Sequence, residues 1–485
     1  MALVSPPLGQ LVPDSPHATV VCLPTLADVE GYERREARVW DLLRGGYPRF
    51  VRNALVEQAA REAAHQLGRT GELFPVISAA SAHRLAEHAE APISSVDQVG
   101  DWCLLTTPAG PAAERLGKLI QHTGTLISSR QAAAWLQGAA IPAAEPALRR
   151  IRESLSPYFH GVAATDLLIT ASGMNAVDAA LAAVNAVQRP RGRKEWIQLG
   201  WLYVDSTRLF EKARDARHHF VTDVRDLAAV ERLLATGTIA AVFTEVPNNP
   251  QLETADVPAL RALCDKYAAK LILDPSSVGV AAVDVLPFAD IVASSLTKYA
   301  AADGDVMAGI LAVNSKVPDA DIMLRVARER QEALHALDAE ALANQVGRLA
   351  DVSRRMSANA AEIARRLSAH PAVARVRTAD QGTTAAAYRR IQRAGFGAGA
   401  LITVELRADM RRTYDRLQVI KGPSFGLRFT LAAPFLWLAH FTEVTSETGR
   451  AQIRAAGLDP DLLRISVGLE SVEEIWAAFD HALAK

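Results

Sequence analysis

The stretch IVASSLTKY, residues 291–299, joins an apolar run to a polar tail that ends in Lys298 and Tyr299. Amphipathic stretches such as 257–270 separate this run from others of the same kind. The other runs are at 167–170, 240–244, 271–274 and 307–313. Apolar runs without strict polar alternation are typical of strands buried on both faces of a sheet. The pattern therefore predicts an α/β domain with a mostly parallel sheet.

The rest of the chain differs from this central part in composition. Residues 1–45 are interrupted by prolines and predict an extended arm, whereas 54–160 and 320–370 have helical spacing. Apolar runs at 373–377, 400–406 and 464–470, followed by a helix from Ser471, predict a smaller α+β domain at the end. We therefore expect three parts: an arm over 1–60, the α/β domain over 61–318 and the α+β domain over 319–485.

Composition excludes several classes of protein. The 485 residues carry 53 Lys and Arg against 54 Asp and Glu, which argues against a nucleic-acid or acidic-membrane partner. Three scattered cysteines favour neither a disulfide scaffold nor a zinc site. The adjacent His218 and His219 would face opposite sides of a strand, so we expect no shared metal. Without a signal sequence or a long apolar stretch, the expected compartment is the reducing cytoplasm.

Two charged residues stand where strands are predicted to end. Lys298 follows the run at 291–294, and Asp274 ends the run at 271–274. Burying either charge without a partner is costly. One ligand explains both, because the aldehyde of pyridoxal phosphate forms a Schiff base with a lysine and its pyridinium nitrogen needs a carboxylate.

A phosphate site is predicted beside them. Ser172-Gly173-Met174 follows a strand run and opens a helical pattern, where free N–H groups favour an anion. The hydroxyls of Ser295 and Thr297 and the ring of Tyr203 are further candidates. Each feature alone is more often a surface loop, a helix cap, a turn or a core residue. Their order at strand ends, where open α/β sheets bind ligands, favours the cofactor site.

Together these motifs resemble the Cys/Met-metabolism family of pyridoxal-phosphate enzymes, which includes cystathionine γ-synthase, the cystathionine lyases and methionine γ-lyase. The motifs that carry the resemblance are Ser172-Gly173-Met174, EVPNNP at 245–250, Asp274, SLTKY at 295–299, DVMAG at 305–309 and RISVGLE at 464–470. The resemblance implies a fold-type-I transferase with a mostly parallel sheet in its large domain and a smaller α+β C-terminal domain.

The resemblance also implies a role for each candidate. Lys298 would hold the cofactor and move protons at Cα, Cβ and Cγ, and Asp274 would keep the ring nitrogen protonated. The amides of Gly173 and Met174, with Ser295 and Thr297, would bind the phosphate.

The remaining roles concern the ring, the substrate and a neighbouring subunit. Tyr203 would stack on the ring as a candidate acid/base, and Asn249 would contact the region of the ring's 3′-oxygen. Arg464 would grip the substrate carboxylate, supported by Ser424. In the Tyr-x-Arg motif, Tyr47 and Arg49 would reach a neighbouring subunit's phosphate, so we expect a homodimer or homotetramer with shared active sites.

The chain departs from the family at two motifs. Val204-Asp205-Ser206 replaces the usual Gly-Gly-Thr after the stacking tyrosine, and no Asn-Pro follows the Tyr-x-Arg motif. GYPRF at 46–50 and PSFG at 423–426 resemble the longer, fungal-type cystathionine γ-synthases. That branch implies γ-replacement on an O-acylhomoserine by a thiol such as cysteine, as in transsulfuration and amino-acid biosynthesis.

Three alternatives remain open. A lyase would release a 2-oxo acid from the same kind of substrate. A non-catalytic pyridoxal-phosphate binder would show the bound cofactor without turnover, and an α/β binding protein would hold no cofactor at all.

Overall fold

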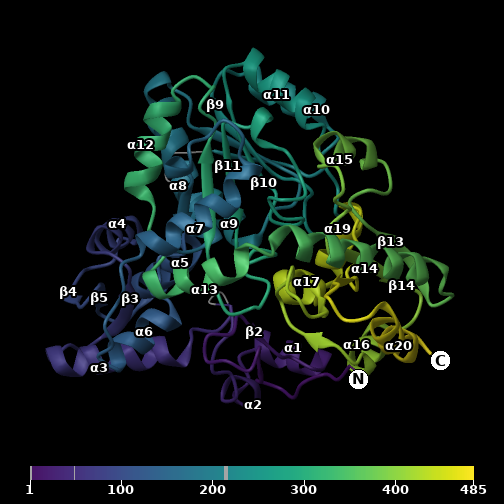
Figure 1. Cartoon of the computed structure of the whole chain (residues 1–485), viewed down its shortest axis with the longest axis horizontal. Helices are drawn as coiled ribbons and strands as arrows, with labels where there is room; N and C mark the ends of the chain where they lie inside the picture. The colour runs from purple at the N-terminus through teal and green to yellow at the C-terminus, as the bar shows by residue number, and fades with distance from the viewer. Residues whose placement is uncertain (1–2, 48–49, 212–216, 485) are drawn as a thin grey trace.

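The computed structural model describes residues 3–47, 50–211 and 217–484. Within these residues a seven-stranded sheet forms the centre of the molecule (Figure 1), in the order β6-β12-β11-β10-β9-β7-β8. Its strands are β6 (Leu168–Thr170), β7 (Glu195–Leu199), β8 (His218–Val221), β9 (Ile239–Glu245), β10 (Lys270–Asp274), β11 (Ile291–Ser295) and β12 (Gly309–Val313). The pairs from β8 to β11 are parallel, and β12 pairs antiparallel with β11 and β6. The predicted mostly parallel sheet is confirmed.

Both faces of this sheet are buried, which explains the unbroken apolar runs. On β10, Ile272 packs with one cluster, whereas Leu271 and Leu273 pack with the other. The helices on the Ile272 face are α8 (Gly173–Gln188), α9 (Val204–Glu211) and α12 (Ala320–Arg330). The helices on the other face are α7 (Glu145–Leu155), α10 (Leu227–Leu234), α11 (Val257–Lys266) and α13 (Ala336–Val346).

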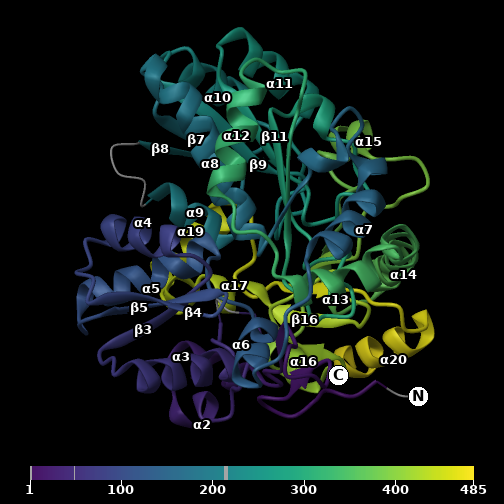
Figure 2. The ribbon, with the colours of Figure 1, turned by 60° about the vertical axis from the view of Figure 1, so that its left-hand side comes forward.

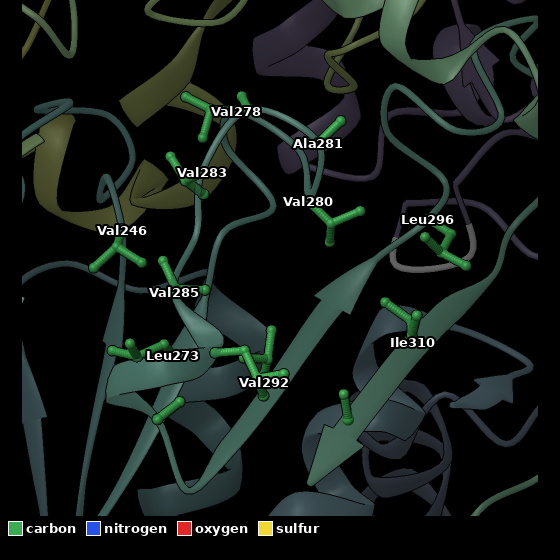
Figure 3. Packing of buried hydrophobic residues seen from close by; sticks show 14 of the residues in the cluster. Val246, Leu273, Val278, Val280, Ala281, Val283, Val285, Val292, Leu296 and Ile310 are labelled. Atoms are coloured by element: carbon green, nitrogen blue, oxygen red, sulfur yellow. The ribbon is translucent and has the colours of Figure 1, made fainter. Parts of the chain in front are cut away.

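The cluster that contains Leu273 reaches the loop beyond β10. Figure 3 shows Leu273, Val292 and Ile310 from three neighbouring strands, with the valines of the segment 278–285 packed near them. This packing fixes the segment that follows Asp274, and so the position of the strand ends.

The C-terminal part is a five-stranded sheet in the order β13-β14-β17-β16-β15. Its strands are β13 (Val373–Arg377), β14 (Leu401–Leu406), β15 (Ile420–Lys421), β16 (Leu431–Pro434) and β17 (Leu463–Ser466), and its helices include α14 (Leu349–Ala369), α16 (Met410–Arg416) and α20 (Val472–Leu483). Ser471 and Glu474 form a capping box that starts α20 at the predicted residue.

A small antiparallel sheet, β3-β5-β4, lies in the stretch that the sequence predicted to be helical. Its elements are β3 (Glu72–Val76), β4 (Ser95–Val99) and β5 (Trp102–Thr107), surrounded by α3 (Ala54–Leu67), α4 (Ala79–Ala89), α5 (Pro111–Thr123) and α6 (Ser129–Leu136). The strands are short and separated by alanine-rich helices, and β3 contains Pro75, which argues against a strand when only sequence is considered.

The N-terminal segment, described over residues 3–47 and 50–53, is folded rather than extended. It contains β1 (Leu11–Val12), β2 (Val20–Val21), α1 (Leu26–Glu33) and α2 (Ala37–Trp40). The segment runs along the base of the molecule in Figure 2, where it meets the C-terminal domain. There the N–H of Leu23 donates to the carbonyl of Lys421 at 2.9 Å, and the hydroxyl of Tyr414 donates to the carbonyl of Leu23 at 2.8 Å.

This contact generates a stability prediction. Tyr414→Phe leaves the carbonyl of Leu23 without its buried donor, and we expect the apparent free energy of unfolding to fall by about 1–2 kcal/mol. Urea unfolding followed by circular dichroism measures the change. Tyr267→Phe is the matched control, because the Tyr267 hydroxyl bonds Glu231 at 3.1 Å in a less buried place. Equal losses in the two variants would contradict the prediction.

Candidate active site

A hollow of about 920 Å³ opens at the carboxyl ends of β9, β10 and β11. We call it the cleft. It lies between the central sheet, the C-terminal domain and the N-terminal segment. The predicted site residues that line it are Tyr47, Gly173, Met174, Tyr203, Asn249, Asp274, Ser295, Lys298, Ser424 and Arg464. The structure therefore brings together residues that are more than 400 positions apart in the sequence.

Lys298 lies just beyond β11, with only 8% of its surface exposed. Its Nζ donates to the Ser424 hydroxyl at 3.0 Å and lies 4.6 Å from the centre of the Tyr47 ring and 4.9 Å from that of Phe425. Burial, and to a lesser degree the nearby charge of Arg464, lowers the pKa of Lys298 to about 7. A large fraction of this amine is therefore neutral near pH 7, as a nucleophile or base requires.

Asp274 is the last residue of β10, and Ser276 holds its carboxylate by hydrogen bonds. The N–H and the hydroxyl of Ser276 both donate to its Oδ1, at 2.8 and 2.5 Å. Burial raises the pKa of Asp274 to about 6 against the opposing effect of these hydrogen bonds. A cationic ring nitrogen would favour its ionised form.

Glu245 is a second carboxyl group that the sequence analysis did not single out. It ends β9 directly opposite Asp274 in the parallel register, and it accepts the N–H of Tyr203. Burial and the charge of Asp274 raise the pKa of Glu245 well above its usual range. Glu245 is the first residue of EVPNNP and ends an apolar strand run. This position in the sequence could have identified it as a site residue.

The start of α8 forms the anion-binding end of the cleft. Ser172 caps the helix through the N–H of Asn175 at 3.1 Å, and the first N–H groups of a helix have no partner within it. A Cβ at Gly173 would lie 2.8 Å from that of Ser295, so only glycine lets the two segments approach. Ser295 Oγ is buried without a hydrogen-bond partner among the described residues. This donor set fits a phosphate group.

Two predicted phosphate ligands are not placed there. The hydroxyl of Thr297 is buried against the backbone of Ala308, accepting its N–H at 3.2 Å, and Thr297 does not line the cleft. The expected hydroxyl ligand is therefore occupied by the chain itself. Arg49 lies outside the described residues.

Arg464, at β17, has 4% of its surface exposed and faces the cleft. Its Nη2 donates to the carbonyls of Pro423 and Ser424 at 2.7 and 3.0 Å. The guanidinium lies between the rings of Phe425 and Phe435, 5.2 and 5.0 Å from their centres. Burial lowers its pKa to about 10, so it stays charged at pH 7. No carboxylate pairs with it among the described residues, which fits a substrate carboxylate.

The outer part of the cleft is an apolar wall that the sequence analysis missed. Its members are Phe50, Phe425, Ala433, Phe435, Leu438 and Ala439. Several of them belong to α17 (Phe435–Ala439), a short helix after β16. Phe50 and Phe425 fall within the GYPRF and PSFG motifs, but no motif marks the positions on β16 and α17, because their proximity to Lys298 arises only when the C-terminal domain packs on the sheet.

The predicted separation of the histidines holds, since His218 stacks on Phe210 whereas His219 contacts Glu195 at 2.7 Å. No group of three or more His, Cys, Asp or Glu side chains suited to a metal occurs in the described part of the chain. No described helix combines the length and apolar character needed to cross a membrane.

Comparison with known proteins supports the interpretation of the cleft. The sequence profile of a family described as "Cys/Met metabolism PLP-dependent enzyme" matches residues 155–484. The L-2-amino-4-chloropent-4-enoate dechlorinase/desaturase of Streptantibioticus cattleyicolor is 36% identical, and the match covers 99% of both chains. The cystathionine γ-synthase of Neurospora crassa is 32% identical over 66% of this chain and 52% of that protein.

A solved structure shows the same fold. Cystathionine γ-synthase from Xanthomonas oryzae aligns with a TM-score of 0.61 and 26% identity, over 70% of this chain and 85% of that one. A lysine with a lowered pKa, a buried carboxyl group, an anion-binding helix start and an arginine with no carboxylate partner among the described residues share one cleft. The chain is therefore a fold-type-I enzyme of the Cys/Met-metabolism family that depends on pyridoxal 5′-phosphate.

Proposed function

We propose that the chain eliminates a leaving group from Cγ of a small L-amino acid whose side chain is uncharged. The observation that carries this proposal is the apolar wall, which lines the cleft beside Lys298 and Arg464. An uncharged side chain gains from burial against Phe435 and Leu438, whereas a charged one loses its hydration there.

The charges of the cleft favour elimination over addition of an amino-acid thiol. Lys298 and Arg464 are the cationic side chains among its described lining residues. Arg464 faces the position of one α-carboxylate. A second amino acid such as cysteine would bring another carboxylate against the apolar wall. The described lining residues offer that carboxylate no cation besides Lys298 and Arg464, and burying it unpaired is costly.

The similarity to the Streptantibioticus cattleyicolor protein supports the same substrate class. That relative is named for dechlorination and desaturation of L-2-amino-4-chloropent-4-enoate, a short amino acid with chlorine on Cγ. Chloride is therefore the leaving group that we propose to test first. The Cγ–Cl bond would break with its electron pair leaving as chloride, and the proton lost from carbon would pass to a base.

The residues of the cleft can divide this work. Bound pyridoxal phosphate supplies the electron sink for charge that develops on the substrate carbons. Arg464 orients the α-carboxylate. The Lys298 amine removes the proton at Cα, passes it to water and then removes a proton at Cβ; return of a proton to Cα leaves an overall loss of one H⁺ and one Cl⁻ from the substrate. Ser424 holds Nζ in place through its hydroxyl, 3.0 Å away. Ser276 holds the carboxylate of Asp274 through two hydrogen bonds, and this carboxylate would pair with the ring nitrogen of the bound cofactor.

A second candidate is the γ-replacement that the sequence predicts. The similarity to the Neurospora crassa cystathionine γ-synthase favours it. In that reaction an O-acylhomoserine loses its acyloxy group and a thiol adds at the same carbon. In elimination Cγ only loses its leaving group, whereas in γ-replacement it also gains a bond to the thiol sulfur. Product analysis therefore separates the two candidates.

The substrate test compares the two reactions in one preparation. The holoenzyme is incubated with L-2-amino-4-chloropent-4-enoate, and separately with O-acetyl- and O-succinylhomoserine, each with and without cysteine. We expect the chloro substrate to release chloride at a rate that cysteine does not change. Its kcat/KM should be at least about tenfold above that of either ester, which corresponds to about 1.4 kcal/mol of discrimination. If instead an ester and cysteine form a thioether with a kcat/KM above that of the chloro substrate, the proposal is overturned and γ-replacement is favoured.

A pH prediction follows from the lowered pKa of Lys298. The amine captures the cofactor only when neutral, so the rate of capture by the apoprotein should rise between pH 6 and 8, with a midpoint about pH 7. Arg464→Met removes a charge that lowers this pKa, so the midpoint should move to higher pH. Stopped-flow absorbance measures the rate.

The control for this experiment is Arg464→Lys, which keeps a positive charge at the same position. Its midpoint should stay near that of the wild type. A wild-type midpoint near the usual pKa of lysine, or the same midpoint in Arg464→Met, would contradict the electrostatic explanation.

A further inference from the structure

Glu245 is a buried acid that the proposed chemistry does not use. It ends β9, with 4% of its surface exposed, and it pairs with Asp274 in the parallel register of β9 and β10. Two residues earlier, the paired Phe243 and Ile272 pack in one apolar cluster, whereas Leu273 packs in the cluster on the other face (Figure 3). Because side chains alternate along a strand, the two carboxyl groups leave the sheet on the same face.

The two carboxyl groups are also close in space. Neighbouring strands of a sheet lie about 4.8 Å apart, and both Glu245 and Asp274 line the cleft. The pairing of the strands continues past them, since the N–H of Val246 donates to the carbonyl of Asp274 at 2.9 Å. Two acids at this spacing repel each other when both are ionised.

No positive side chain balances this pair in the described part of the chain. The cationic side chains among the described lining residues of the cleft are Lys298 and Arg464. Lys298 donates to the Ser424 hydroxyl, whereas Arg464 donates to two backbone carbonyls. Two buried negative charges without a cation are costly, so only one of the two acids is expected to be ionised.

Hydrogen bonds decide which acid keeps its charge. Oδ1 of Asp274 accepts both the N–H and the hydroxyl of Ser276, at 2.8 and 2.5 Å, whereas Glu245 accepts the N–H of Tyr203. Donors stabilise the ionised form, so the proton is expected on Glu245. The pKa values agree, because burial and the charge of Asp274 raise the pKa of Glu245 well above its usual range, whereas the pKa of Asp274 rises to about 6.

The hydrogen bond from Tyr203 gives this acid a structural task. Tyr203 lines the cleft and lies in the connection between β7 and α9, directly before the helix begins at Val204. In the first turn, the carbonyl of Tyr203 accepts the N–H of Thr207 at 3.1 Å. Glu245 therefore holds the backbone at the point where Tyr203 faces the cleft.

We propose that Glu245 is a neutral carboxylic acid and the positioning residue for Tyr203. Its carbonyl oxygen holds the Tyr203 backbone, and its proton leaves Asp274 as the one negative charge of the pair. The positive ring nitrogen of the cofactor then meets a single carboxylate, and no unbalanced charge remains buried there.

Infrared difference spectroscopy of the holoenzyme tests the protonation of Glu245. Between the wild type and Glu245→Gln at pH 7, we expect the carbonyl band of a carboxylic acid in the wild type alone. The band should shift to lower frequency in protein made with glutamate that carries carbon-13 in its side-chain carboxyl. A missing band, or a band that shifts only with aspartate labelled in the same way, would overturn the proposal.

The matched control for the infrared measurement is Glu231→Gln. The Glu231 side chain is 40% exposed and accepts from Lys266 Nζ at 2.8 Å, and this partner lowers the pKa of Glu231. Glu231 is therefore ionised at pH 7, and its replacement should leave the carboxylic-acid band unchanged.

Cofactor binding tests the positioning role. Glu245→Gln keeps an uncharged oxygen acceptor, so its Kd for pyridoxal phosphate, titrated by absorbance, should stay within about twofold of the wild-type value. Glu245→Met fills similar space but removes the acceptor of the Tyr203 N–H, so its Kd should rise about tenfold. In a Tyr203→Ala background the same Met substitution should add little, because Glu245 acts through Tyr203.

Each outcome separates positioning from charge and from packing. If Glu245→Gln weakens binding as much as Glu245→Met, the site needs a charged Glu245 and the proposal is overturned. Wild-type affinity in Glu245→Met, or a loss that adds fully to that of Tyr203→Ala, would also overturn it. Far-UV circular dichroism checks the fold, and Glu245→Leu replaces Glu245→Met if that variant does not fold. Neither readout uses a substrate, so failure of the proposed elimination would not affect them.

Discussion

The burial of the Lys298 amine is the constraint on which the site depends. An amine placed at the end of a buried strand loses its hydration, and here its direct hydrogen bond goes to the neutral Ser424 hydroxyl. Its pKa therefore falls to about 7. A hydrated surface lysine would be almost wholly charged at that pH and could not serve as a nucleophile. The same burial acts in the opposite direction on Asp274 and Glu245, whose pKa values it raises.

The surrounding structure maintains this burial from three directions. The central sheet supplies the strand ends, the C-terminal domain supplies Arg464 and most of the apolar wall, and the N-terminal segment supplies Tyr47 and Phe50. Arg464 stays charged between two phenyl rings, ready for a carboxylate. The result is a cleft that is polar where a cofactor and an α-carboxylate would bind and apolar where a side chain would lie. We connect this division with elimination from a short, uncharged substrate.

The parts that the sequence predicted correctly are those where local pattern and chemistry agree. Apolar runs located the central strands, and the charged residues after them, Asp274 and Lys298, do share one edge of the sheet. The predictions failed where packing between distant segments decides the structure. The β3-β5-β4 sheet pairs short strands between helices, and the proline-rich start folds because it has the C-terminal domain to pack against. Thr297, whose hydroxyl accepts the N–H of Ala308, remains a predicted phosphate ligand. The domain limits at 60 and 318 remain predictions.

The most direct test of this account is the chemical location of the cofactor. The purified holoenzyme is reduced with borohydride, digested and mapped by mass spectrometry, which fixes the cofactor on the side chain that holds it. We predict the label on the peptide that contains Lys298, with the other buried lysines of the described residues, Lys270 and Lys421, unlabelled. A label on another lysine, or none on a protein that absorbs as the bound cofactor does, would contradict the account.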